Sequence, residues 1–256
     1  MRVNRVERPQ GLVSQGVPLG DPGEGEPSRQ DRPGAVGSPP GCFVVLEGID
    51  GCGKTTQLEH LGQWLPTSGL MPAGAHLLTS REPGGTPLGR ALRELLLHPP
   101  TGASPCSDAE LLLYAADRAQ HVSQVIRPAL EAGDWVLCDR FSGSTAAYQG
   151  YGRGLPLERI AALEGFATSG LEPDLTIWLD LPLEESLRRR GGRAADRIEA
   201  SGHAFLARVA AGFATLARQR GWQRVDASQR CEVVTQECQA ALLGHAAGAP
   251  EGRSDG

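Results

Sequence analysis

The sequence predicts an α/β fold in which one parallel β-sheet lies between two layers of helices. Short apolar segments alternate along the chain with segments of helical spacing, and this alternation is typical of parallel strands joined by crossover helices. The five apolar segments cover residues 42–47, 76–80, 135–139, 175–180 and 223–227. The chain has 256 residues, of which 40% are hydrophobic and 21% charged, so it can bury one substantial core.

Seven helices are expected between and after these strands. Several begin at a Ser, Thr, Pro or acidic residue, and these residue types favour the first helical turn. The expected ranges are 54–65, 87–97, 108–132, 156–168, 182–190, 202–220 and 232–245. They indicate one domain at 42–247, between an N-terminal extension at 1–41 and a tail at 248–256. Both end segments lack a sustained apolar period, so we expect them to be disordered.

Charge and cysteine content disfavour several classes of protein. The net charge of −5 argues against binding to nucleic acid, which usually requires a basic surface. No apolar stretch reaches the roughly 20 residues that span a bilayer, and the N-terminus lacks the apolar core of a signal peptide. The six cysteines show no spacing typical of a zinc site. We therefore expect a cytoplasmic protein with reduced thiols that binds neither nucleic acid nor a membrane.

A phosphate-binding motif follows the first predicted strand. Residues 48–55 read G-x-x-x-x-G-K-T, between an apolar strand and a helix. The glycines let backbone N–H groups surround phosphate oxygens, Lys54 reaches the β- and γ-phosphates, and the Thr55 hydroxyl is suited to ligate Mg²⁺. Lys54 is the only lysine, beside 25 − 1 = 24 arginines, which indicates that a compact charge is needed there. The motif predicts a P-loop NTPase fold that binds ATP, with a chance match in a glycine-rich chain as the alternative.

Two arginines follow predicted strands beside an acidic residue. Arg81 precedes Glu82 after the second strand, and Asp139 precedes Arg140 after the third. Ligands of an open parallel sheet bind beyond the carboxyl ends of its strands. Both pairs are therefore expected to form anion clamps that face the phosphate-binding loop. Solvated surface ion pairs are the alternative.

Several motifs together resemble those of the bacterial thymidylate kinases, a family of P-loop nucleoside monophosphate kinases. The motifs are the loop at 48–56, TSREPGGT at 79–86, the pair Asp139-Arg140, AYQG at 147–150, PDL at 173–175 and DRIE at 196–199. They follow the order and spacing of the family over about 42–245. The resemblance implies transfer of a phosphoryl group from ATP to dTMP with Mg²⁺, which supplies dTDP for dTTP synthesis and DNA replication. It also implies a short mobile lid and a homodimer.

The resemblance also implies the residues of the site. ATP would be bound by Gly48, Ile49, Asp50, Gly51, Cys52, Gly53, Lys54, Thr55 and Thr56, with Arg189 against the adenine. The nucleotide dTMP would be bound by Asp50, Arg81, Arg93, Tyr114, Arg118, Arg140, Thr145, Tyr148 and Gln149. Catalysis is assigned to Lys54, Asp50, Arg140 and Arg193, and Mg²⁺ to Thr55 and Asp50.

Physical chemistry gives several of these residues a role. An aromatic platform at Tyr114 suits a flat thymine ring, although this residue could instead belong to the core. Arg118 can donate to a base carbonyl, while the other three arginines can hold the acceptor phosphate. Tyr148 is a candidate for filling the space of a ribose 2′-hydroxyl, which would favour deoxyribose.

Five arginines surround a double glycine in the segment 188–197, which looks like a lid over ATP. An arginine supplied to the transferring phosphoryl group can raise the rate by ~10³-fold or more. In one branch of the family a basic residue of the phosphate-binding loop does this, but the corresponding residue here is Gly51. We therefore expect Arg193 to act from the lid, with Arg190 and Arg197 as alternatives. The alternative for the whole segment is a solvated basic helix end.

Three other functions stay open at this point. The chain could phosphorylate another nucleoside monophosphate, act as a non-catalytic nucleotide sensor, or be a degenerate paralogue without activity. Guanine-specific switches commonly use an N-K-x-D motif, which a chain whose only lysine is Lys54 does not contain. The intact loop, the arginine clamps and the lid argue against a degenerate paralogue.

Overall fold

The computed structural model describes residues 41–191 and 196–248. The predicted disordered extension, apart from Gly41, lies outside these ranges, as do residues 249–256 of the predicted tail and Arg193 of the predicted lid. Gly248 was assigned to the tail, but it is the last residue of a helix that begins at Cys231. The assignment of Gly248 was therefore wrong, because the helix continues three residues beyond its expected end.

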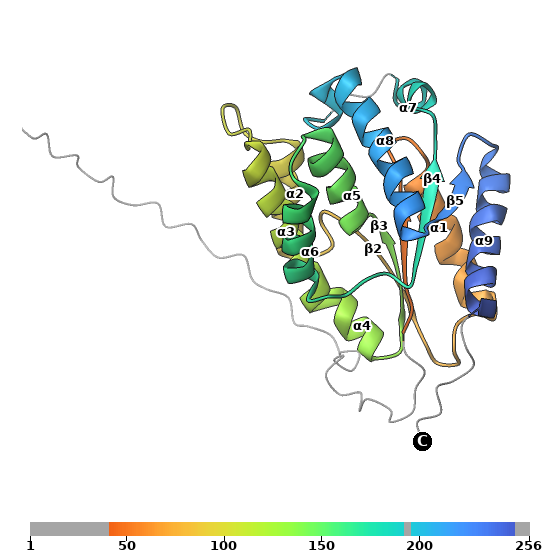
Figure 1. Cartoon of the computed structure of the whole chain (residues 1–256). Coiled ribbons are helices and arrows are strands. Elements are labelled where there is room, and N and C mark those ends of the chain that lie inside the picture. Colours follow the sequence, from red (N-terminus) through yellow and green to blue (C-terminus); the bar gives the residue numbers. More distant parts are fainter. Residues whose placement is uncertain (1–40, 192–195, 249–256) are drawn as a thin grey trace, which may run out of the picture. The chain divides into compact units, whose positions relative to one another are not determined.

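The five predicted strands form one parallel sheet, as Figure 1 shows. They are β1 (Phe43–Glu47), β2 (Leu77–Arg81), β3 (Trp135–Asp139), β4 (Leu175–Asp180) and β5 (Gln223–Asp226), in the order β2-β3-β1-β4-β5. Strand β1 is central, so Val45 pairs with Cys138 on one side and with Thr176 on the other. All five residues of β1 and of β3 are buried, as a continuous apolar run in a parallel sheet predicts. The carboxyl ends of the strands meet at one edge of the sheet.

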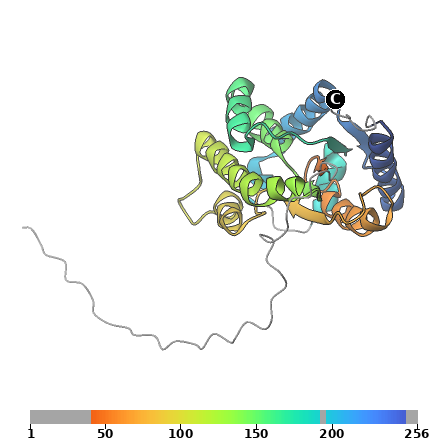
Figure 2. The same ribbon diagram turned by 90° about the horizontal axis from the view of Figure 1, so that it is seen from below.

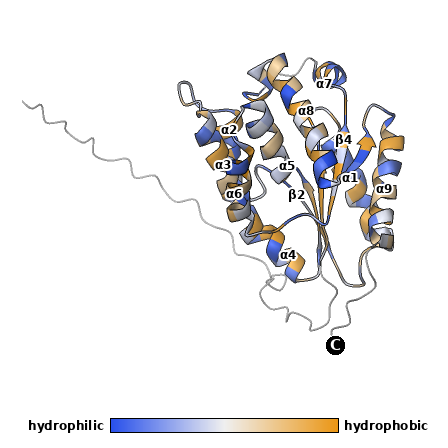
Figure 3. Cartoon of the chain, viewed as in Figure 1, coloured by the Kyte–Doolittle hydropathy of each residue, from blue (hydrophilic) through white to orange (hydrophobic). Residues whose placement is uncertain are grey.

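Helices cover both faces of the sheet, which confirms the predicted three-layer α/β/α fold (Figures 1 and 2). On one face α1 (Lys54–Trp64) packs beside α9 (Cys231–Gly248), while α4 (Arg127–Glu131) and α8 (His203–Arg220) lie over the other. Alternate residues of β1 point to opposite faces of the sheet: Val44 and Leu46 belong to one buried cluster, and Phe43 and Val45 to another. Most helices carry both hydrophobic and hydrophilic residues, as Figure 3 shows, because one side of each packs inward.

The remaining helices connect or flank these elements. They are α2 (Pro87–Leu97), α3 (Ser107–His121), α6 (Leu157–Thr168), α7 (Leu183–Arg190) and the short turns η2 (Leu65–Thr67) and η5 (Glu199–Ser201). The predicted helix at 108–132 consists of α3, a wide π-helical turn η3 (Val122–Ile126) and α4. Pro128, which cannot donate a backbone hydrogen bond, follows this turn. In the described ranges no helix is long and apolar enough to cross a bilayer.

Apart from the short turns, one helical segment of the described ranges was not predicted from the sequence. It consists of α5 (Ser142–Thr145) and the π-helical η4 (Ala146–Gly152), whose sequence is rich in Gly and Ser. Its start is stabilised by Glu47 at the end of β1, since Glu47 Oε1 accepts the backbone N–H groups of Phe141 and Ser144, each at 3.0 Å. A buried carboxylate from a distant strand thus replaces a local helix signal.

Candidate active site

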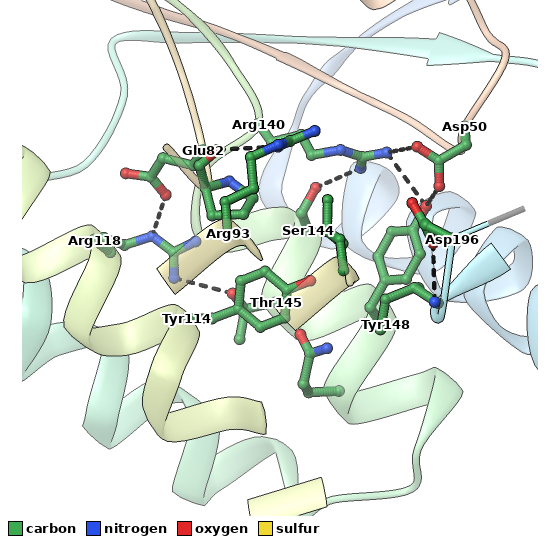
Figure 4. Close-up of a pocket in the computed structure, with 14 residues that line it drawn as sticks. Asp50, Glu82, Arg93, Tyr114, Arg118, Arg140, Ser144, Thr145, Tyr148 and Asp196 are labelled. Carbon is green, nitrogen blue, oxygen red and sulfur yellow. Dashed lines mark hydrogen bonds and ion pairs between the residues drawn. The ribbon is translucent and has the colours of Figure 1, made fainter. Parts of the chain in front are cut away.

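A cavity opens at the carboxyl edge of the sheet, beside the phosphate-binding loop (Figure 4). Eight of the nine residues predicted to bind dTMP line it, which are Asp50, Arg93, Tyr114, Arg118, Arg140, Thr145, Tyr148 and Gln149. The other lining residues are Glu82, Pro83, Leu97, Ser144, Asp196 and Ile198. The open space in and above this cavity amounts to about 560 Å³. The tertiary fold therefore brings together side chains from six segments that are far apart in the sequence.

Lys54 lies folded against the phosphate-binding loop. Its ammonium donates to the carbonyl oxygens of Gly48 and Ile49, each at 3.0 Å, and it contacts Cys52 Sγ at 3.7 Å. The side chain is buried although it is charged. Gly53 stands before the first residue of α1 with a φ of 98°, a conformation that favours glycine. The loop thus delivers the chain to the helix N-terminus, where backbone N–H groups can bind an anion.

Gly51 has little room for a side chain. A Cβ atom added there would lie 3.2 Å from Arg190 Cγ and 3.2 Å from the carbonyl oxygen of Ser186, and its φ is 79°. The Ser186 hydroxyl also donates to the carbonyl oxygen of Asp50 at 2.6 Å. Helix α7 therefore packs directly on the loop, close to the point where a side chain at residue 51 would begin.

Arg140 joins the loop to the unpredicted helical segment. Its Nη1 donates to the carbonyl oxygen of Gly48 at 3.0 Å and to the Ser144 hydroxyl at 2.8 Å, and its Nη2 donates to Asp50 Oδ1 at 2.6 Å and to the Tyr148 hydroxyl at 3.3 Å. Figure 4 shows the contacts of Arg140 with Asp50, Ser144 and Tyr148 on the loop side of the cavity. The φ of Arg140 is 74°, which is unusual for a residue with a side chain. Such strain is concentrated at functional sites.

Asp50 is held as a carboxylate by its neighbours. Tyr148 donates its hydroxyl hydrogen to Asp50 Oδ2 at 2.7 Å. Burial opposes the charge, but Arg140 and Lys54 outweigh burial and hold the pKa of Asp50 well below its usual value. Burial also opposes the charge of Arg140, whose pKa is nevertheless raised by Tyr148 and Asp50. The loop side of the cavity is therefore a paired set of charges rather than a set of free cations.

Arg118 is buried between two acidic residues. Its Nε donates to Glu82 Oε2 at 2.7 Å, and its Nη1 donates to the Thr145 hydroxyl at 3.0 Å and to Glu164. Among the described residues no partner reaches its Nη2. Glu82 Oε1 in turn lies 2.9 Å from His121 Nδ1. These contacts fix the guanidinium at the wall of the cavity and leave one nitrogen available to a ligand.

Three other residues that were predicted to bind dTMP differ in their positions. Arg93 lies in the cavity and donates to the carbonyl oxygen of Pro83 at 3.0 Å, and burial together with the charge of Arg81 lowers its pKa. Arg81 itself is exposed and lines a neighbouring hollow with Thr55 and Asp139 instead of the cavity. Tyr114 lines the cavity and belongs to neither buried core cluster, and burial raises its pKa, so its phenol is neutral.

Thr55 faces an acidic residue that was predicted only as part of an anion clamp. The Thr55 hydroxyl donates to Asp139 Oδ2 at 3.3 Å, while Asp139 Oδ1 is buried without a partner among the described residues. Asp50, the other predicted Mg²⁺ ligand, is committed to Arg140 and Tyr148. The described ranges contain no cluster of three or more His, Cys, Asp or Glu side chains suited to hold a metal. The oxygens of Thr55 and Asp139 fit a hard cation that takes most of its ligands from phosphates and water.

The described part of the lid segment is held by ion pairs. Arg189 donates to Glu185 at 2.8 Å and to the carbonyl oxygen of Ala227 at 3.0 Å, in the turn after β5. Arg190 Nη1 lies 3.5 Å from Glu199 Oε1. Arg197 lies 2.6 Å from Glu110 Oε2 and donates to the carbonyl oxygen of Leu96 at 2.7 Å.

Sequence reasoning missed four buried acidic residues that support the cavity, which are Glu47, Glu110, Asp117 and Glu164. Glu47 holds the helical segment that carries Thr145, Tyr148 and Gln149. Glu110 accepts a hydrogen bond from Gln149 Nε2 at 2.7 Å, and Asp117 accepts one from the N–H of Gly84 at 3.0 Å. An acidic residue inside an otherwise apolar strand or helix was the only sequence signal, and it does not reveal the partner.

Asp117 carries a carboxylate that is destabilised by its surroundings. Its Oδ2 is buried without a partner among the described residues. Burial, followed by the charge of Glu82, raises the pKa of Asp117 to about 6. Because this value lies above that of an unfolded chain, about 3.9, the folded state binds the proton more tightly. The cost of the buried charge is therefore fully present above pH ~6 and disappears as the pH falls toward ~4.

Asp117→Asn removes this charge but keeps an acceptor for Gly84. We expect the substitution to raise the free energy of unfolding by about 2 kcal/mol near pH ~8 and to give no such gain near pH ~4.5, as measured by urea denaturation. Asp108→Asn is the matched control, because the Asp108 side chain is 67% exposed. An equal effect of Asp117→Asn at both pH values would contradict the expectation.

Comparison with known proteins agrees with this geometry. Residues 46–238 match the family model described as thymidylate kinase. The chain is 66% identical over 207 residues to "Thymidylate kinase" of Synechococcus sp. (strain WH7803), covering 81% of this chain and 97% of that protein. It is also 66% identical over 205 residues to "Thymidylate kinase" of Prochlorococcus marinus (strain MIT 9313), covering 80% of this chain and 95% of that protein. With the phosphate-binding loop, the arginine-lined cavity and these similarities in agreement, the chain belongs to the thymidylate kinase family.

Proposed function

We propose that this chain phosphorylates dTMP to dTDP with ATP. As a member of the thymidylate kinase family it is an ATP-dependent nucleoside monophosphate kinase. The observation that carries the proposal is the single cavity that places the predicted acceptor residues beside the phosphate-binding loop. In the proposed arrangement the thymine base lies beside Tyr114, Arg118 and Gln149, and the acceptor phosphate lies toward Arg93 and Arg140.

ATP is proposed to bind at the loop and at the N-terminus of α1. Backbone N–H groups of residues 48–56 and the ammonium of Lys54 would surround its phosphates. The adenine is proposed to lie against Arg189, which donates to the carbonyl oxygen of Ala227 in the turn after β5. Arg81 is proposed to act from the hollow between the two nucleotides rather than from the dTMP cavity, since it lines that hollow with Thr55 and Asp139.

The divalent metal used by this family is proposed to be Mg²⁺. The oxygens of Thr55 and Asp139 would hold it, because Asp139 Oδ1 is buried without a described partner and Asp50 is already paired. A bound Mg²⁺ would neutralise charge on the β- and γ-phosphates. The residues of the chain would do the rest: they would bind both nucleotides, align the acceptor oxygen with the γ-phosphorus and exclude water.

Transfer needs no general base from the protein. A phosphate monoester is already largely dianionic at neutral pH, so the acceptor oxygen can attack without first losing a proton. Arg140 would hold that phosphate, and Asp50 would hold Arg140 in place and accept a hydrogen bond from the sugar 3′-hydroxyl. Catalysis in this proposal consists of positioning and charge neutralisation.

Arg193 is proposed as the arginine that acts on the transferring phosphoryl group. The alternatives Arg190 and Arg197 each lie beside an acidic residue, Glu199 and Glu110. Either arginine would have to leave that ion pair to reach a phosphate, which costs free energy. The structure of Arg193 lies outside the described ranges, so its role stays a prediction.

The experiment that tests the function is a panel of acceptors with ATP and Mg²⁺. We expect the highest kcat/KM with dTMP, lower values with dUMP, and values lower by about 10²-fold or more with UMP, CMP, AMP and GMP. A preference for CMP or AMP would overturn the assignment, and undiminished turnover with EDTA would overturn the role of the metal. In the same assay Arg193→Ala is expected to lower kcat. An unchanged kcat would mean that Arg193 does not act on the transferring phosphoryl group.

A homodimer is proposed from an apolar face. Leu95 on α2, Leu112 on α3 and Phe166 on α6 are 45%, 58% and 82% exposed, on helices that pack side by side. A second copy of the chain could cover such a patch. We expect sedimentation equilibrium to give twice the chain mass of 27.0 kDa, and the mass of one chain would contradict the dimer.

A cytoplasmic location is proposed from the six cysteines, all of which are free thiols.

A further inference from the structure

Glu110 lies behind the wall of the cavity, on the first turn of α3. Its side chain is 1% exposed, and it is surrounded by three hydrogen-bond or ion-pair partners from other segments. Gln149 Nε2 donates to Glu110 Oε1 at 2.7 Å, Arg153 donates to both carboxylate oxygens at 3.2 Å, and Arg197 lies 2.6 Å from Oε2. Burial opposes the charge, but the hydrogen bonds from Arg153 and Gln149 lower the pKa of Glu110 below its usual value. Glu110 is therefore a carboxylate at neutral pH.

A carboxylate determines which end of an amide can face it. An ionised carboxylate only accepts hydrogen bonds, so the group of Gln149 that lies 2.7 Å from Glu110 must be the NH₂ group. A reversed amide would place two oxygen atoms in contact without a hydrogen between them. Glu110 thus fixes the orientation of the Gln149 amide. The carbonyl oxygen of Gln149, Oε1, is the end of the amide that does not face Glu110. Gln149 lines the cavity, and within the described residues no donor reaches this Oε1.

Arg118 supplies the complementary group. Its Nη2 has no partner within the described residues, and a guanidinium nitrogen can only donate. Figure 4 shows the Arg118 side chain at the cavity wall beside Thr145 and Tyr114. The cavity therefore offers one obligatory donor, from Arg118, and one obligatory acceptor, from Gln149.

Pyrimidine bases differ in the same two properties. Thymine and uracil present a carbonyl acceptor at C4 and an N–H donor at N3, whereas cytosine presents an amino donor at C4 and a bare acceptor at N3. An Arg118 donor and a Gln149 acceptor match the first pattern. Against cytosine they would place donor against donor and acceptor against acceptor, and unmatched buried polar groups discriminate strongly.

We infer that Glu110 is the positioning residue that makes the cavity select a pyrimidine with a hydrogen on N3. It acts through Gln149, by holding the amide nitrogen and so turning the amide oxygen toward the base. The inference rests on the proposed placement of the base beside Gln149, and it adds a residue that does not touch the nucleotide.

The test compares dTMP with 5-methyl-dCMP, two substrates that differ only at C4 and N3. The measured quantity is the ratio of kcat/KM for dTMP to kcat/KM for 5-methyl-dCMP. Glu110→Gln can donate to or accept from the Gln149 amide, so this amide can turn either way. We expect Glu110→Gln to lower the ratio by about tenfold to a hundredfold. An unchanged ratio would overturn the inference.

Arg153→Gln is the matched control for damage to the same buried cluster. It removes a partner of Glu110 but keeps the hydrogen bond between Glu110 and Gln149. We expect Arg153→Gln to leave the ratio within about threefold of the parent value, since the amide is still held. A fall in the ratio as large as that of Glu110→Gln would mean that loss of packing, and not amide orientation, sets the specificity.

A charge-conserving exchange keeps the inference testable if Glu110→Gln folds poorly. In the double variant Glu110→Gln with Gln149→Glu, the new amide donates to the new carboxylate, whose second oxygen still presents an acceptor to the base. We expect the ratio to recover by about tenfold relative to Glu110→Gln, or to stay near the parent value. A double variant that accepts 5-methyl-dCMP as readily as dTMP would overturn the inference.

Gln149→Met separates failure of the inference from failure of the proposed placement. Methionine has a similar length but no amide, so it should lower the ratio if the base lies beside residue 149. A lowered ratio in Gln149→Met with an unchanged ratio in Glu110→Gln would refute the role of Glu110 alone. Unchanged ratios in both variants would refute the placement of the base as well.

Discussion

Lys54→Arg is expected to lower kcat/KM for ATP by about 10³-fold, nearly as much as Lys54→Ala. The ammonium fits between the carbonyl oxygens of Gly48 and Ile49, at 3.0 Å from each, and the side chain is only 5% exposed. A planar guanidinium has the same charge but needs more width, and Cys52 Sγ already lies 3.7 Å from the Lys54 ammonium. Steady-state kinetics with varied ATP measures the effect.

Arg218→Lys is the matched control for this exchange of basic residues. Arg218 lies in an exposed position on α8, where its contact with Thr215 is 3.4 Å long. We expect Arg218→Lys to leave kcat and KM unchanged, since it is remote from the loop. If Lys54→Arg retained the parent rate while folding normally, the requirement for a compact charge in the loop would be refuted.

Arg140→Ala is expected to lower kcat/KM for dTMP by about 10³-fold or more, and Arg140→Lys by about 10²-fold. The guanidinium contacts Asp50, Gly48, Ser144 and Tyr148 at once. A lysine keeps the charge but has one nitrogen, so it cannot hold both the loop and the helical segment. Initial rates at varied dTMP measure these effects, and near-parent activity of Arg140→Ala would exclude Arg140 from the mechanism.

The backbone of Arg140 allows a second measurement on the same residue. With a φ of 74°, an alanine at this position keeps the strain while a glycine relieves it. Arg140→Gly should therefore unfold with a free energy about 1 kcal/mol higher than Arg140→Ala, although both variants are expected to lose most of their activity. Equal stabilities in urea denaturation would show that the left-handed conformation is lost with the side chain.

The strands and the phosphate-binding loop could be predicted from the sequence because their signals are local. A continuous apolar run, such as the one at 43–46, indicates a buried parallel strand. The G-x-x-x-x-G-K-T motif carries its own geometry, since glycines permit the positive φ values of Gly48, Gly51 and Gly53. The observed strands differ from the predicted ranges by at most one residue at each end.

The helical segment Ser142–Gly152 could not be predicted because its stability is not local. Its Gly and Ser residues have low helix propensity, and it is stabilised by Glu47, which lies about a hundred residues earlier in the chain. The pairing of Asp139 with Thr55 could not be predicted either, because it also joins distant parts of the chain. The sequence had suggested Asp50, and not Asp139, as the residue that ligates the metal together with Thr55. The exposed position of Arg81, outside the dTMP cavity, also follows only from the fold.

The sequence by itself therefore determined the parallel sheet and the loop that binds phosphate, and its resemblance to a known family implied most of the side chains that line the cavity. Tertiary structure alone decided what each of those side chains can do there. Lys54 is held between two carbonyl oxygens, Arg140 is paired with Asp50, and Gln149 is turned by Glu110. Each of these contacts is a hydrogen bond, and a hydrogen bond depends on the distance and the angle between its partners, which only the folded chain fixes.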